Sequence, residues 1–253
     1  IRLQDGQLYG FEALIRGPAD SVFHSPVMLF EQAAMAGLSG CLDQVCMAAI
    51  FREFSEQRLP GVLFVNVLPD TLLSEDVSVE MLQHMLAVNG IAGSRVVLEL
   101  TETRPQGGYP ALRLVADRLR TAGLRLALDD LGEGFSNLRL WSELRPEFVK
   151  IDKHFIHGIA DDRIKFHFVR AMQDLAEIGN ALLVAEGIER EEDFVCIRDM
   201  GIACGQGYFI AHPDSTPLRQ LSRRTLSALV QQSLALSPMT GGPGRLPTAR
   251  SLL

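Results

Sequence analysis

The sequence contains few cysteines, and their spacing matches no metal or redox motif. Its 253 residues include only Cys41, Cys46, Cys196 and Cys204, with no Cys-x-x-Cys pair. A chain of this length buries enough apolar surface to fold without covalent cross-links. The pattern therefore favours free thiols in a reducing cytoplasm over a disulfide-bonded secreted protein or a zinc-binding module.

Clusters of positive charge and long apolar segments are also missing. The formal net charge is −7, and without a basic cluster a nucleic-acid polymer is a poor partner. No apolar run approaches the roughly 18 residues of a membrane-spanning helix, and no signal peptide is recognisable. The chain begins at Ile1 inside a strand-like segment without an initiator Met, so we expect it to belong to a longer protein with further domains.

What the sequence does contain is an alternation of strand-like and helix-like segments. Asp5-Gly6 between alternating segments predicts a hairpin over residues 1–16, and Ser25-Pro26 predicts the start of a helix that ends near Gly37. Further strands are predicted at Val62–Val67, Val96–Thr101, Leu124–Asp129, Phe148–Asp152, Ala181–Glu186 and Ile202–Ile210. Further helices are predicted at Leu42–Leu59, Val79–Val88, Tyr109–Ala122, Ser136–Leu144, Asp161–Ile178, Arg190–Met200 and Pro217–Leu236.

This alternation predicts an α/β domain over residues 1–237, with a parallel sheet covered by helices. With the hairpin counted as two strands, the total is about eight, which favours a closed barrel; an open doubly wound sheet is the alternative. Residues 238–253 are rich in Pro, Gly and Thr, and we interpret them as a linker to another domain.

Polar residues occur at the C-terminal end of almost every predicted strand. They are Glu12, Asn66, Glu99, Asp129, Asp130, Lys150, Asp152, Glu186 and Gln206. In a parallel barrel these ends share one rim, so the side chains should converge. A single acid at a strand end is usually a cap or a surface residue, but the repetition points to a site. Adjacent aspartates repel each other, and Mg²⁺ or Mn²⁺ would relieve the repulsion, with Lys150 as a smaller supplement.

The motifs around these residues resemble the EAL domain, a family of cyclic di-GMP phosphodiesterases. Glu12-Ala13-Leu14 stands in "YGFEALIR", and "VNVLP", "LELTE", "LALDDLGEGFS", "FVKID", "VAEGIE" and "GQGYFIAHP" follow in the family's order within residues 1–213. The resemblance implies a modified (β/α)8 TIM-like barrel with one antiparallel strand. It further implies hydrolysis of cyclic di-GMP to linear pGpG in bacterial second-messenger signalling, two Mg²⁺ or Mn²⁺ ions per site, and a homodimer.

The same resemblance implies a role for each site residue. Glu12, Asn66, Glu99 and Asp129 resemble the ligands of one metal ion, and Asp129, Asp130 and Glu186 resemble those of a second. Glu12, Lys150 and Glu186 form the expected catalytic set, in which Lys150 orients or helps deprotonate the attacking water. Arg16, Asp152 and Gln206 are similar to substrate-binding and water-supporting residues, and Glu102 and Glu189 to residues that stabilise the loops.

The chain departs from the family in the loop after the paired aspartates. The family usually has D-D-F-G-T/A-G-Y-S-S, whereas this chain has Leu131, Glu133 and Phe135 at three of those positions. We expect Glu133 to point to solvent; the alternative is that it weakens substrate approach. Two other functions therefore stay open: a weakly active or inactive cyclic di-GMP receptor that signals through a partner domain, and a metal-dependent barrel acting on another phosphate ester.

Three smaller features have ordinary explanations. Gly132-Glu133-Gly134 lacks the third glycine of a dinucleotide fingerprint. His154 and His157 have a spacing that could bind a metal, but solvated histidines are the simpler interpretation. Trp141, the only tryptophan, is expected either at a dimer contact or in ordinary packing.

Overall fold

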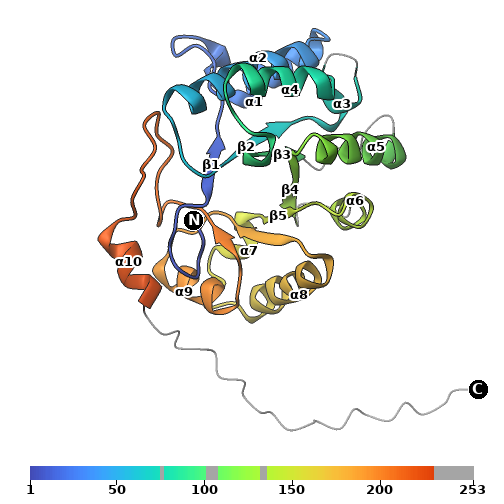
Figure 1. The fold of residues 1–253 in the computed structure, drawn as a ribbon. Helices are drawn as coiled ribbons and strands as arrows, with labels where there is room; N and C mark the ends of the chain where they lie inside the picture. Colours follow the sequence, from blue (N-terminus) through green and yellow to red (C-terminus); the bar gives the residue numbers. More distant parts are fainter. Residues whose placement is uncertain (75–76, 101–107, 132–135, 231–253) are drawn as a thin grey trace, which may run out of the picture.

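The computed structural model describes residues 1–74, 77–100, 108–131 and 136–230. These residues form a sheet of seven parallel strands, hydrogen-bonded to one another in chain order. The strands are β1 (Gly10–Ala13), β2 (Val62–Val67), β3 (Val96–Leu100), β4 (Arg125–Leu131), β5 (Phe148–Ile151), β6 (Leu182–Ala185) and β7 (Cys204–Gly205). The sheet curls into a half-barrel with the helices outside it, which confirms the predicted TIM-like α/β architecture (Figure 1).

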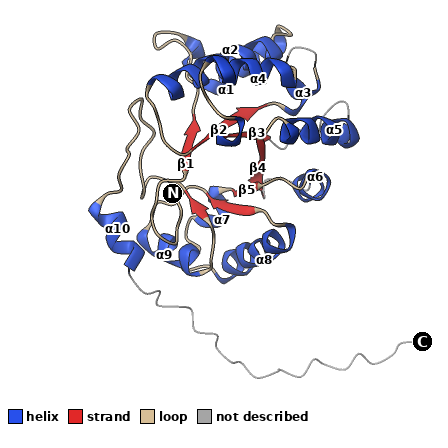
Figure 2. Ribbon diagram, viewed as in Figure 1, coloured by secondary structure: helices blue, strands red, loops and turns tan. Residues whose placement is uncertain are grey.

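Helices cover the outer face of the sheet and connect one strand to the next (Figure 2). They are α1 (Pro26–Met35), α2 (Ser39–Glu56), α3 (Pro69–Leu73), α4 (Val79–Val88), α5 (Gly108–Thr121), α6 (Ser136–Leu144), α7 (Lys153–Ile156), α8 (Arg163–Gly179), α9 (Glu191–Asp199) and α10 (Arg223–Val230), with 3-10 turns η1 (Val22–His24) and η2 (Gly93–Arg95). The predicted helices before residue 201 are present with small shifts at their ends. The predicted helix Pro217–Leu236 begins only at Arg223, and its residues after Val230 lie outside the described ranges. The short α3 and α7 were not predicted. None of the helices in the described ranges is long and apolar enough to cross a membrane.

Apolar residues pack on both faces of the sheet. A large cluster fills the space between the strands and the outer helices, and Trp141 belongs to it with 5% of its surface exposed, so ordinary packing accounts for this residue. A second, smaller cluster fills the inside of the curled sheet and consists of Phe64, Val97, Ala127, Phe148, Val184 and Cys204. The Phe64 and Phe148 rings lie 5.3 Å apart there, in an edge-to-face arrangement. This inner cluster forms an apolar floor inside the half-barrel.

The antiparallel strand expected at the start of the chain is not seen among the described residues. The turn over residues 2–7 does form, with Gly6 N donating to Arg2 O at 2.9 Å. However, the first limb lies against β7, where Arg2 and Cys204 form only an isolated antiparallel bridge. Leu3 is fully buried, so this limb is anchored on β7 by its side chain. The predicted hairpin is therefore wrong as a pair of strands, although its turn is present.

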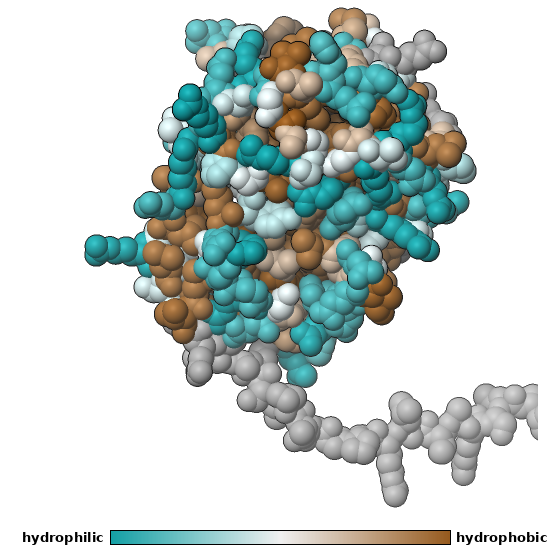
Figure 3. Space-filling model, viewed as in Figure 1, coloured by the Kyte–Doolittle hydropathy of each residue, from teal (hydrophilic) through white to brown (hydrophobic). Residues whose placement is uncertain are grey.

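The segment after β7 also differs from the prediction. The expected strand Ile202–Ile210 is reduced to Cys204–Gly205. Gly207 has a φ of +150°, and a Cβ there would approach Ile188 N to 2.2 Å, so the chain turns sharply at this glycine. Beyond it the chain runs along one side of the barrel to α10, where apolar residues gather at the lower left of Figure 3. The predicted linker at 238–253 lies outside the described residues and stays a prediction.

Candidate active site

Seven of the predicted site residues form a polar layer directly above the apolar floor. Side chains alternate between the two faces of a strand, so a residue two positions after an inward-facing one also faces inward. Counting two positions on from the six floor residues gives Asn66, Glu99, Asp129, Lys150, Glu186 and Gln206. Glu12 of β1 lies beside Phe64 of β2 in the sheet register, and its carboxylate reaches the same layer, where it contacts Lys150 and Gln206. The strand-end pattern in the sequence therefore corresponds to one ring of side chains.

Lys150 lies at the centre of this layer. Its Nζ is 3.2 Å from Glu12 Oε2, 3.0 Å from Glu99 Oε1, 2.9 Å from Asp129 Oδ1 and 2.8 Å from Glu186 Oε1. The lysine side chain is only 3% exposed. One ammonium group thus faces four carboxylates in a poorly solvated space. Lys150 is more central than the sequence suggested, but a single charge leaves the layer strongly negative.

Two amides connect the carboxylates to one another. Gln206 Nε2 donates to Glu12 Oε2 at 2.7 Å and to Glu186 Oε1 at 2.8 Å. Asn66 Nδ2 donates to Glu12 Oε1 at 3.3 Å. These bonds hold Glu12 and Glu186 at a fixed separation across the gap between β1 and β6. Gln206 therefore orients two carboxylates here, in addition to its expected contact with substrate.

A bulge in β4 brings both adjacent aspartates to the same side of the sheet. The register against β5 shifts between Leu128 and Leu131, and Asp130 has a left-handed φ of +52°. In a regular strand, neighbouring side chains would face opposite ways. Here carboxylate oxygens of Asp129, Asp130 and Glu186 all lie within 4.8 Å of one another. The unusual backbone thus gathers three carboxylates at one point.

Burial and mutual repulsion perturb the acidity of the layer. Burial raises the pKa of Glu99 well above its ordinary value, because the nearby Lys150 charge only partly compensates. Burial also raises the pKa of Glu186 to about 7, and Asp129 and Glu12 add to the effect. For Glu12, the Lys150 charge and the bonds from Gln206 outweigh burial, so its pKa is lowered. The four carboxylates outweigh the effect of burial on Lys150 and raise its pKa well above 10.5.

The donor set fits hard divalent cations. Carboxylate and amide oxygens are the ligands that Mg²⁺, Mn²⁺ and Ca²⁺ prefer. Glu99 Oε2 is buried and has no hydrogen-bond partner among the described residues, which leaves a lone pair directed into the layer. The Asp129, Asp130 and Glu186 cluster offers oxygens from three residues at one point. Additional positive charge would therefore satisfy both an orphaned acceptor and the surplus of carboxylates.

The other predicted residues that the structure describes line an open cleft of about 1250 Å³ above the layer. Arg16 and Glu189 line it, as does Asp152, whose carboxylate accepts a bond from His154 N at 2.8 Å and so caps α7. His157 is 59% exposed and lies 3.9 Å from Glu189, as expected of a solvated histidine. Glu102 and Glu133 lie outside the described residues.

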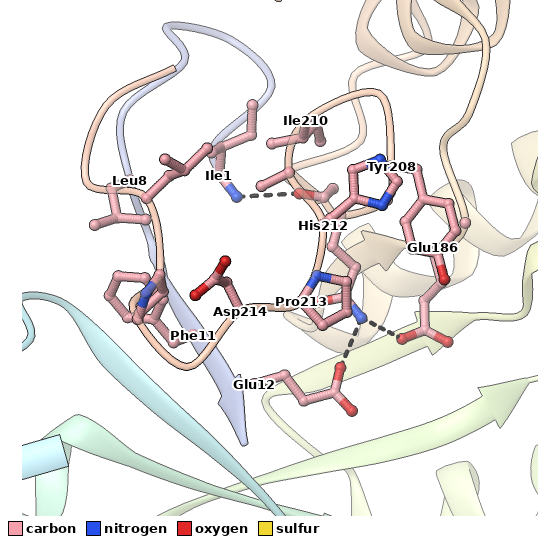
Figure 4. A pocket seen from close by; sticks show the side chains of 18 of the residues that line it. Ile1, Leu8, Phe11, Glu12, Glu186, Tyr208, Ile210, His212, Pro213 and Asp214 are labelled. Atoms are coloured by element: carbon pink, nitrogen blue, oxygen red, sulfur yellow. Dashed lines mark hydrogen bonds between the residues drawn. The ribbon is translucent and has the colours of Figure 1, made fainter. Parts of the chain in front are cut away.

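Part of the cleft wall could not be found from the sequence. Residues 207–221 supply one side of the cleft, including Tyr208, His212 and Asp214 (Figure 4), and the first four of them were expected to belong to the strand Ile202–Ile210. The N-terminal segment supplies Ile1, Leu8 and Phe11. Apart from Phe11 in β1, these residues lie on irregular chain that only the folded structure brings to the site, so the strand-end pattern gives no signal for them.

A curled parallel sheet with an acidic layer at its carboxyl ends defines a TIM-like α/β fold with a candidate metal-binding cluster at the rim where such folds carry their active sites. The family model of the EAL domain matches residues 1–213. Because the match covers most of the chain, this protein belongs to the EAL domain family.

Known proteins similar to this chain support that assignment. The chain is 28% identical over 215 residues to the probable cyclic di-GMP phosphodiesterase PdeB of Escherichia coli, covering 82% of this chain and 40% of that protein. It is 30% identical to Klebsiella pneumoniae BlrP1 in a calcium and cyclic di-GMP complex, with a TM-score of 0.76, covering 84% of this chain and 53% of that one. BlrP1 was also solved with manganese and cyclic di-GMP. A standalone Vibrio cholerae EAL protein, at 21% identity and a TM-score of 0.81 over 89% of this chain and 94% of that one, shares the fold.

Proposed function

We propose that this chain hydrolyses cyclic di-GMP to linear pGpG with the help of two divalent cations. The observation that carries the proposal is the acidic layer, in which four carboxylates share one lysine and Glu99 keeps an unpaired buried oxygen. Relatives named as cyclic di-GMP phosphodiesterases support the choice of substrate. The chain spans 40% of the length of PdeB, so the activity of any longer protein is part of the same proposal.

The residues would divide into two groups of ligands. Glu12, Asn66, Glu99 and Asp129 would hold one cation, and Asp129, Asp130 and Glu186 would hold the other. A bound pair of dications lowers the pKa of water and stabilises both the attacking and the leaving oxygen of a phosphodiester. Arg16, on the wall of the cleft, would bind the phosphate that is not cleaved.

Lys150 would act on the attacking water. Its Nζ lies 2.8–3.2 Å from four carboxylates at the centre of the layer, within reach of a water held there. Lys150 would orient this water by donating a hydrogen bond or help to deprotonate it. In the reaction the water oxygen would bond to phosphorus and give up one proton to a basic group of the layer, while the bond from phosphorus to O3′ breaks and O3′ takes up one proton.

A turnover assay tests this proposal against the receptor alternative. Purified chain is incubated with cyclic di-GMP and Mn²⁺ or Mg²⁺, with and without a chelator, and the nucleotides are separated by chromatography. We expect pGpG in the presence of metal and none with the chelator. Tight binding without product would support the receptor instead. Neither binding nor product would contradict both.

A substitution at Glu12 tests the assignment of the first cation. Glu12→Ala removes a ligand and the partner of Lys150, Gln206 and Asn66, so we expect turnover to be lost. Glu31→Ala, on the exposed surface of α1, is the matched control and should keep full activity. Circular dichroism should show that both variants remain folded. Retained turnover in Glu12→Ala would contradict the ligand assignment. The homodimer is part of the proposal, and sedimentation of the purified chain would test it.

A further inference from the structure

Two aromatic rings stack on each other in the wall of the cleft. The ring centroids of Tyr208 and His212 are 4.3 Å apart, and the ring planes are inclined by 26°. Both residues line the cleft, and Tyr208 is 57% exposed. Figure 4 shows the two rings side by side above Glu186, with Leu8 and Phe11 across the cleft in this view. An aromatic surface is therefore open to solvent in the cleft beside the acidic layer.

The chain around Tyr208 is held in place by the backbone. Ile188 N donates to Gln206 O at 3.0 Å, Phe209 N donates to Ile188 O at 2.9 Å, and Ile210 N donates to Gly207 O at 2.9 Å. The side chains of Phe209 and Ile210 are buried and anchor the turn from below. These bonds therefore fix the backbone that carries Tyr208 relative to Gln206, whose amide contacts Glu12 and Glu186.

Stability of the fold does not explain this pair. A large aromatic side chain contributes to folding mainly by removing its surface from water, and more than half of the Tyr208 surface stays in contact with it. The two rings contact each other, yet neither belongs to the apolar clusters of the core. A preorganised, exposed aromatic surface is what nucleic-acid-binding sites use to stack bases, since every base offers a flat π face.

We infer that the Tyr208–His212 pair is the platform on which one purine base of the nucleotide substrate stacks. This inference rests on the proposed function and adds the position of a base to it. The Tyr208 ring is two residues from Gln206, so a base on the platform would place its ribose and phosphate toward the acidic layer. The cleft, at about 1250 Å³, exceeds the roughly 300–1,000 Å³ of common small-molecule sites and has room for a dinucleotide.

A fluorescent nucleotide tests the inference directly. The probe is a cyclic dinucleotide with 2-aminopurine in place of one guanine, because stacking quenches the emission of 2-aminopurine. Binding is measured with Ca²⁺ for the wild type and for Tyr208→Phe, Tyr208→Ala, His212→Ala and His84→Ala. His84 is exposed on α4 and serves as the matched histidine control.

The wild type, Tyr208→Phe and His84→Ala should bind the probe and quench it. Tyr208→Ala should abolish the quenching and weaken binding by about 5- to 150-fold, the range measured for loss of one stacked base. His212→Ala should give an intermediate result, since it removes only the support of the ring. In turnover of cyclic di-GMP, Tyr208→Ala should raise KM by a similar factor and leave kcat nearly unchanged, because the base lies away from the reacting phosphorus.

The outcomes separate this inference from the proposed function. If the wild type hydrolyses cyclic di-GMP and Tyr208→Ala keeps both its affinity and the quenching, the platform is wrong and the enzyme stands. A fall in kcat at unchanged KM would also overturn it, since that result means a structural disturbance of Gln206. If the wild type neither binds nor hydrolyses any cyclic dinucleotide, both the function and the platform are wrong.

Discussion

Replacing Lys150 with methionine removes the only cation that the described side chains place within the acidic layer. Methionine keeps most of the volume, so the change isolates the charge. Four carboxylates lie 2.8–3.2 Å from Nζ in the wild type, and the lysine side chain is 3% exposed. Removing one partner of a buried ion pair costs about 3–5 kcal/mol, because the remaining charge stays buried.

We expect the loss of stability to stay within this range, because the carboxylates left without Lys150 can bind protons and so reduce their mutual repulsion. Without metal, Lys150→Met should therefore lower the free energy of unfolding by about 3–5 kcal/mol. At about 2–4 °C per kcal/mol for a domain of this size, the melting temperature should fall by roughly 6–20 °C. The loss should shrink as pH falls below about 7, because protons then neutralise carboxylates such as Glu186 in the folded variant. It should shrink likewise when Mn²⁺ replaces the missing positive charge.

The assay is thermal and urea unfolding of both proteins in chelated buffer and again with Mn²⁺. Lys165→Met is the control, since the one bond that Lys165 Nζ makes to the described residues is an exposed bond to His157 O at 2.7 Å. A loss in Lys150→Met no larger than in Lys165→Met, with no recovery on adding Mn²⁺, would refute the reasoning. It would mean that the carboxylates are well solvated and need no counter-charge.

Three further perturbations follow from the same structure. Burial raises the pKa of Glu186 from 4.5 to about 7, so the folded state holds this proton more tightly than the unfolded state. The free energy of unfolding without metal should therefore fall as pH rises from 4.5 to about 7. Glu186→Gln should make the free energy of unfolding, measured in urea, less dependent on pH over this range. Gly207→Ala should lower both melting temperature and turnover, since a Cβ would lie 2.2 Å from Ile188 N; activity equal to the wild type would show that the turn adapts. Asp193→Ala should lower the free energy of unfolding, measured in urea, by about 2–5 kcal/mol, because the buried carboxylate accepts hydrogen bonds from Gly158 N and Ala160 N. A decrease below about 1 kcal/mol would mean that water satisfies those two amides.

Local pattern predicted the regular elements and the polar layer well. Val62–Val67, Val79–Val88 and Ser136–Leu144 have the bounds expected from periodicity and capping. The strand-end polar residues converge because alternation along each strand is a local property, and the parallel sheet aligns the strand ends. Each residue of the layer could therefore be predicted from its own strand, without knowledge of its contacts in the folded structure.

The features that sequence could not supply depend on long-range contacts. The first limb of the expected hairpin lies on Cys204, at the other end of the described domain, since Leu3 finds its buried place there. The left-handed Asp130 looks like any strand residue until the register against β5 is known. The Tyr208–His212 pair stacks across an irregular turn, whose path is set by the close approach of Gly207 to Ile188.

The lysine inside the acidic layer also bears on when the protein can fold. In many small metalloproteins the ion is needed for folding, so the empty chain is degraded. Here the ammonium group of Lys150 is part of the chain itself, and it contacts four of the carboxylates without any bound metal. We therefore expect newly made chains to stay folded without bound metal. The supply of divalent cations would then control the activity of the protein and leave its cellular amount unchanged.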